Sequence, residues 1–284
     1  KSTQNMQTNK LISLIVIFQF LSLIFYFFSP FITNEINYFD ILISREMNGD
    51  IGYYPLVVEY SNLNFNPTFL ENIKNDKFVS FPFLPIIIQS FLYKIFGVFS
   101  FVILIFIFQL LLILSLFILF KKILNHEVKS FFFIILLNIF LIIINIINLN
   151  FNINFLENIF NLFNSFFGFR YPRPLLTSPI IFFGIYLLID FEKKISLNPS
   201  NYYITILIVL GLLLHLFFYY FIIFSFLIVL IFFVKIKKID FKEINFFKLS
   251  FYTFLFFLIF IIPYILQQMN IEPDNSSRIG IINL

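Results

Sequence analysis

Long apolar runs alternate with short polar segments along most of the chain, a pattern that predicts a series of membrane-crossing helices. A helix needs about 20 predominantly apolar residues to cross a bilayer. Runs that reach or approach this length are residues 11–32, 82–120, 131–147, 175–189, 202–234 and 251–266. Runs 82–120 and 202–234 each fit one long helix or two short ones, with breaks expected at 94–97 and 215–220. We therefore expect an all-α fold, a polytopic transmembrane helical bundle of about seven to eight membrane helices.

One long polar interval, residues 34–81, interrupts this pattern between the first two runs. In its segment 38–47, the apolar side chains at positions 39, 42, 43 and 47 have the spacing of an amphipathic helix. We expect this short helix to lie on the membrane surface, and Asn48-Gly49-Asp50 to end it. Residues 53–80 are punctuated by Asn and Pro and predict a loop with little regular structure.

The composition agrees with a membrane protein. Of the 284 residues, 60% are hydrophobic and only 12% are charged, whereas soluble domains have about 25% charged residues. The chain has no cysteine, which excludes disulfides, a thiol nucleophile and thiolate metal sites. Asn138 and Asn145 lie inside apolar runs, where each needs a hydrogen-bonding partner because lipid supplies none.

Charge is unevenly distributed along the chain. The interval 34–81 holds seven carboxylates and three basic side chains, a net charge of −4, although the whole chain carries +4. Lysines gather instead near the N-terminus and at 121–129, 193–194 and 235–248. Lys and Arg favour the cytosolic side of a membrane. If 82–120 crosses once and 202–234 twice, all these lysines are inside, and the acidic interval is outside; we prefer this layout, although the threading of 82–120 stays open.

We expect one transmembrane domain over residues 1–284, integral to the cell inner or plasma membrane, with 34–81 as an outer loop carrying the candidate active site. The chain starts without Met and stops just past the polar run 267–278, so we expect an N-terminal fragment of a longer chain. Basic residues lie at the ends of the predicted helices and form no stripe of the kind that binds nucleic acid.

The order of features after the first span resembles a known family. An outer segment with an early Asp (FDILISREMNGD, residues 39–50) is followed by a proline-marked entry to the next helix (FPFLPIIIQSFLYKIFG, residues 81–97). This resembles the start of GT-C type glycosyltransferases, multi-pass enzymes that use polyprenyl-phosphate sugars, over roughly residues 11–120. Matching positions are Asp40, Gly49, Pro82, Pro85 and Gly97. The prolines are separated instead of adjacent, and no acidic pair follows the first span.

The resemblance implies transfer of a sugar from a polyprenyl-phosphate donor to an acceptor hydroxyl. A carboxylate deprotonates or orients that hydroxyl, which attacks the anomeric carbon while the lipid phosphate leaves. Asp40 is our first candidate for this catalytic role, and Glu46 and Asp50 follow it. The alternative is that all three are solvated charges at headgroup level. A lone Asp40 acts without a cofactor, whereas an acidic cluster can hold a divalent cation; both options stay open.

Other candidates for substrate binding lie further along the chain. Arg170 and Arg173, in the string GFRYPRP, are suited to the donor phosphate because guanidinium groups bind phosphate with two parallel hydrogen bonds; alternatively, they anchor a helix to lipid headgroups. His215 and Tyr219 lie in HLFFYY, and an ionisable residue inside a membrane segment is a functional candidate. The alternative for His215 is a neutral ring bonded to a neighbouring helix. No second His or carboxylate stands at ligand spacing in that stretch, so we expect no metal site there.

A non-enzymatic transporter or flippase of a lipid-linked saccharide is the main alternative function. Transporters contain charged residues within spans and paired broken helices. In this sequence, the signs of that class are His215 and the break expected at 215–220.

Overall fold

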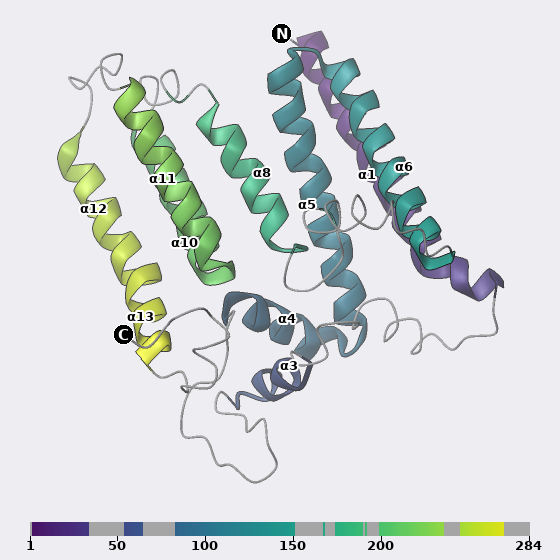
Figure 1. The fold of residues 1–284 in the computed structure, drawn as a ribbon, viewed down its shortest axis with the longest axis horizontal. Coiled ribbons are helices and arrows are strands. Elements are labelled where there is room, and N and C mark those ends of the chain that lie inside the picture. The colour runs from purple at the N-terminus through teal and green to yellow at the C-terminus, as the bar shows by residue number, and fades with distance from the viewer. Residues whose placement is uncertain are drawn as a thin grey trace. The chain divides into compact units, whose positions relative to one another are not determined.

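The computed structural model describes residues 2–33, 54–64, 83–150, 167, 174–189, 191, 199–235 and 245–269 (Figure 1). Every regular element within these ranges is a helix, which confirms the all-α prediction for this part of the chain. Four helices are long and apolar enough to cross a membrane, at Thr8–Phe25, Phe99–Leu124, Pro199–Leu216 and Phe246–Leu266. They indicate a membrane-embedded protein. The amphipathic helix expected at 38–47 lies outside the described residues.

The helices follow one another in the order shown by the colours of Figure 1. Their bounds are α1 Ser2–Thr33, α3 Tyr54–Ser61, α4 Phe83–Phe96, α5 Phe99–Leu124, α6 Glu127–Asn150, α8 Thr177–Leu188, α10 Pro199–Leu216, α11 Phe218–Lys235, α12 Phe246–Phe256, the π-helical turn η3 Phe257–Ile261, and α13 Ile262–Met269. They group into two compact units. The first holds α1, α5 from Phe101 onward, α6 and most of α8, and the second holds α3, α4 and the helices from α10 onward.

The core of the first unit is formed where α1, α5 and α6 pack together. Its buried side chains are Ile15 of α1, Leu112, Ile113, Leu116 and Phe117 of α5, and Ile134 of α6. Helices α5 and α6 are joined by the two residues Asn125 and His126, and Asn125 has a positive φ of 50°, a conformation that Asn tolerates better than most residues. The short connection makes α6 turn back along α5.

A buried amide pair joins α1 and α6 inside this unit. The side-chain amide of Asn138 donates a hydrogen bond to the Gln19 side chain, and both residues are buried. The prediction that Asn138 needs a polar partner is therefore confirmed. Within a membrane such bonds contribute modestly, about 0.6 kcal/mol on average, but they fix the rotational setting of the two helices.

The run 82–120 is divided into two helices of unequal length. Helix α4 has 14 residues and α5 has 26, so only α5 reaches the length of a membrane span. Gly97 separates them with a φ of +58°, a left-handed conformation that glycine adopts without steric cost. The break expected at 94–97 is thus confirmed, and only the second of the two helices is long enough to cross.

Helix α3 corrects the prediction of an irregular loop over residues 53–80. Residues 54–61 are helical, with Pro55 in the first turn, where its missing N–H costs nothing. Leu56, Val57 and Tyr60 are buried, because α3 packs against α4. The sequence prediction was wrong here because it weighed the prolines and asparagines and overlooked the i, i+1, i+4 apolar stripe between them.

The run 202–234 is also divided in two. Helices α10 and α11 have 18 residues each and meet at Phe217, inside the HLFFYY string where a break was expected. The two helices lie side by side in the second unit (Figure 1). Neither Gly nor Pro marks this break; the Phe217 ring packs instead on the rings of Tyr219 and Tyr220, with centroids 5.2 and 4.9 Å apart.

Candidate functional site

The sequence-predicted site residues are only partly within the described ranges. Asp40, Glu46, Asp50, Arg170 and Arg173 all lie outside them, so their roles stay predictions. His215 and Tyr219 are described, and both belong to the second unit, on opposite sides of the break at Phe217.

His215 lies at the last turn of α10 and is 7% exposed. Its Nε2 is 3.0 Å from the backbone carbonyl oxygen of Phe260, in the π-helical turn of the last membrane helix. Its ring also packs on the rings of Phe260 and Tyr264, with centroids 6.0 and 5.9 Å apart. This bond is the one that the alternative interpretation of His215 expected, a ring bonded to a neighbouring helix. The bonded group is a main-chain carbonyl, which could not be identified from the sequence.

The π-helical turn has a local cause in the sequence. Pro263 stands two residues after it and has no N–H to donate to the carbonyl four residues earlier. The hydrogen bonding shifts ahead of this proline, so that the N–H of Ile262 bonds to the carbonyl of Phe257, five residues back. Such π turns within α-helices are frequent at functional sites.

Gly211 allows α10 to approach this turn closely. A Cβ added to Gly211 would lie 2.4 Å from Cγ and Cδ1 of the Phe260 ring, far inside van der Waals contact. Gly211 and His215 are four residues apart and so share one face of α10. His215 bonds to the Phe260 carbonyl, and Gly211 leaves the space that the Phe260 ring occupies. We call Gly211, His215, Phe260 and Tyr264 the His215 junction.

The other ring nitrogen of His215 is buried and unsatisfied. Nδ1 has no hydrogen-bond partner among the described residues. A buried polar atom without a partner costs about 1–3 kcal/mol, and such atoms are uncommon in native structures. Nδ1 lies close to two irregular points of the chain, the turn between α10 and α11 at Phe217 and the π turn before α13.

Tyr219, the other candidate of this segment, has a different environment. Its side chain is 48% exposed and packs on the rings of Phe217 and Phe218. Tyr264 is the tyrosine in ring contact with His215, and it also stacks on Phe218 at 5.8 Å. Sequence reasoning missed Tyr264 and Phe260, although Pro263 was a usable sign that the helix around them is irregular.

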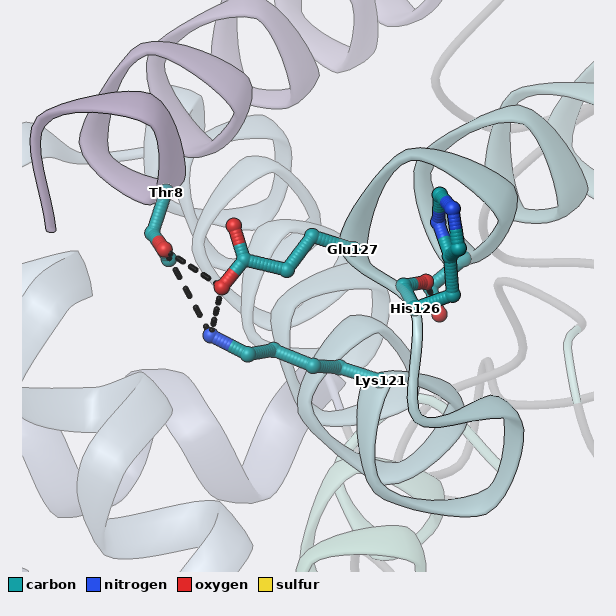
Figure 2. A network of polar contacts seen from close by, with 5 residues as sticks. Thr8, Lys121, His126 and Glu127 are labelled. Atoms are coloured by element: carbon teal, nitrogen blue, oxygen red, sulfur yellow. Dashed lines mark hydrogen bonds and ion pairs between the residues drawn. The ribbon is translucent and has the colours of Figure 1, made fainter. Parts of the chain in front are cut away.

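A second polar cluster lies in the first unit, where α1, α5 and α6 meet (Figure 2). Lys121 Nζ is 2.5 Å from Glu127 Oε1, and the Thr8 hydroxyl donates to the same oxygen at 2.7 Å. These bonds, that from Lys121 above all and then that from Thr8, lower the pKa of Glu127 below its usual value. His126 caps the start of α6, because its Nδ1 accepts from the backbone N–H of Lys129. The cluster joins the N-terminal part of α1 to the α5–α6 connection.

The described residues contain no group of three or more His, Asp or Glu side chains that could hold a metal ion. The carboxylates for which a divalent cation was considered lie outside that part of the chain. Comparisons with protein-family models, with curated proteins and with solved structures find no match to this chain.

Proposed function

We propose that this chain is a multi-pass membrane glycosyltransferase that moves a sugar from a polyprenyl-phosphate donor to an acceptor hydroxyl at the outer face of the cell inner or plasma membrane. The observation that carries the proposal is the cluster of polar side chains at one end of the first unit, which indicates how this unit is oriented in the membrane. Thr8, Lys121 and Glu127 meet at one end of it, so the N-terminus and the lysine segment 121–129 share a side. Since lysines favour the cytosol, this end is inside.

The acidic interval is then outside. The part of α1 from Thr8 to its end at Thr33 is about 38 Å long at 1.5 Å per residue, which exceeds the roughly 30 Å hydrocarbon core. In the chain, the interval 34–81 follows α1 and precedes α4. A carboxylate-rich outer loop between these helices is what the resemblance to GT-C enzymes requires.

Seven crossings account for the helices in this layout, namely α1, α5, α6, α8, α10, α11 and the continuous helix from α12 to α13. Helix α4, with 14 residues, does not cross in this layout. The 12-residue α8 is counted as a crossing because the lysine segments before α6 and after α8 otherwise fall on opposite sides. All the lysine segments named above then lie inside, and Asp40, the two arginines at 170 and 173, and His215 lie at the outer side. In this proposal Asp40 takes the acceptor proton, the arginines bind the donor phosphate, and His215 and Tyr219 bind the saccharide.

The test is sugar transfer in membranes supplied with polyprenyl-phosphate sugars. We expect Asp40→Asn to lose most of the transfer, because the amide cannot accept the hydroxyl proton. Asp76→Asn is the matched control, a carboxylate of the same interval that the mechanism does not use. Arg173→Ala is expected to weaken donor use more than it lowers expression. Full transfer by the Asp40→Asn protein would remove Asp40 from the mechanism.

A specific observation favours the second candidate, a transporter or flippase of a lipid-linked saccharide. The π turn interrupts the regular hydrogen bonding of the α12–α13 helix at the His215 junction, and broken helices mark the substrate sites of many transporters. The two functions differ in their products. Purified protein in liposomes that moves a lipid-linked saccharide across the bilayer, and leaves its sugar bond intact, would favour transport.

A further inference from the structure

We infer that the His215 junction is a binding site for a hydroxyl-bearing ligand, with Nδ1 of His215 as the acceptor of a ligand O–H. The choice of a saccharide as that ligand rests on the proposed function. The acceptor role follows from the structure alone.

The tautomer of His215 is determined by its neighbour. A carbonyl oxygen can only accept a hydrogen bond, so Nε2, at 3.0 Å from the Phe260 oxygen, must carry the hydrogen. The side chain is more than nine-tenths buried, in a helix long and apolar enough to cross a membrane, where a charged imidazole is disfavoured. Nδ1 of the neutral ring is then a lone pair, and it needs a partner that donates a hydrogen.

The chemistry of this lone pair selects the ligand class. A phosphate or carboxylate presents oxygen lone pairs and is not attracted to it. A metal ion would need further ligands, and the described residues offer no group of three His, Asp or Glu side chains. A hydroxyl group donates the hydrogen that Nδ1 lacks.

Aromatic rings of the α12–α13 helix and of α11 pack beside the imidazole. Phe260 and Tyr264 pack against the imidazole, and Phe218 of α11 stacks on Tyr264 with an interplanar angle of 10°. Ligand sites combine such apolar and aromatic walls with a few polar groups that orient the ligand. A saccharide offers both apolar C–H faces and hydroxyl donors.

Chemical modification of a single histidine tests the site. The chain has two histidines, so the full-length His126→Gln protein retains only His215. Diethylpyrocarbonate acylates an unprotonated imidazole nitrogen, and mass spectrometry measures the rate. We expect an alkyl glucoside at ten times its Kd to slow this reaction about elevenfold, the factor 1 + [L]/Kd. An alkyl phosphate of the same chain length should not slow it.

Three outcomes would overturn the inference. They are that His215 is never modified, that the alkyl phosphate protects it as well as the glucoside does, or that the glucoside does not protect it.

Two variants separate binding from folding. His215→Gln keeps an amide N–H for the Phe260 carbonyl and should retain thermal stability, while its affinity for the alkyl glucoside falls about tenfold, as expected for one lost hydrogen bond. His215→Phe loses both functions of the ring and should also lower the melting temperature. Equal glucoside affinity in the wild-type and His215→Gln proteins would remove Nδ1 from the site.

Ligand protection and sugar transfer are measured separately, so the failure of this site can be distinguished from the failure of the proposed enzyme. Protection by the glucoside without any sugar transfer keeps this site and removes the glycosyltransferase. Transfer without protection removes the site and keeps the enzyme.

Discussion

At the residue scale, a close approach of two helices in the second unit depends on the missing side chain of Gly211. Helices in lipid gain little from the hydrophobic effect on associating and rely on close packing, which small residues permit. Gly211 provides such a contact with the Phe260 ring. The hydrogen bond from His215 to the Phe260 carbonyl then lies one turn further along the same face.

Gly211→Ala is therefore expected to destabilise the protein, by about 1–3 kcal/mol as for an overpacked core, because its Cβ would overlap the Phe260 ring. Thermal unfolding in detergent measures the effect. Combining it with Phe260→Leu should recover part of the loss, since the smaller side chain frees space. Equal losses in the single and the double variant would contradict the proposed overlap.

The buried amide pair of the first unit gives a second residue-scale prediction. Asn138→Leu leaves the Gln19 side chain without its donor, and we expect a loss of up to about 1.7 kcal/mol, the upper range for such bonds in membranes. The double variant Gln19→Leu/Asn138→Leu should be less damaged than the sum of the two single ones, because no polar group is left unpaired. Unfolding in a detergent series tests this; strict additivity would argue against the pair.

At the element scale, helix ends decide how the chain turns. Gly97 ends α4 and Pro263 distorts the last helix, and both are recognisable in the sequence. The α5–α6 connection depends instead on polar contacts to α1, through Glu127. Because Lys121 is 38% exposed, solvent weakens its attraction to Glu127, and the pair belongs with surface ion pairs, which contribute about 0.2–1 kcal/mol.

The stability contributed by Glu127 should depend on pH. Its pKa is lowered in the folded protein from an ordinary 4.5, so the folded state favours the ionised form. The contribution is complete above the unfolded value of 4.5 and is lost as pH falls through the lower folded value. Melting temperatures of wild type and Glu127→Gln should differ at pH 7 and converge in acid. A difference that does not change with pH would exclude this role, and Lys121→Met should reproduce the behaviour of Glu127→Gln.

At the scale of the whole molecule, the distribution of lysines predicts which side of the membrane each segment faces. The absence of cysteine makes this testable with single reporters in an otherwise unreactive chain. We expect Asn37→Cys to react with a membrane-impermeant maleimide on intact cells, and Asn125→Cys to react only after permeabilisation. Labelling of both positions from the same side would reverse or abolish the outer-loop assignment.

The sequence by itself determined the helical fold class, the breaks near 94–97 and 215–220 and the polar partner needed by Asn138, because run length, glycine and lone polar residues act locally. It did not predict α3, whose helix is stabilised by packing on α4, or the meeting of His215 with Phe260, 45 residues further along the chain. Hydrophobic patterns report how far a helix extends, and in lipid nearly every face is apolar, so they carry little information about which faces meet. Only the tertiary structure decided that pairing, through a glycine that permits close contact and a carbonyl beside a proline-distorted turn.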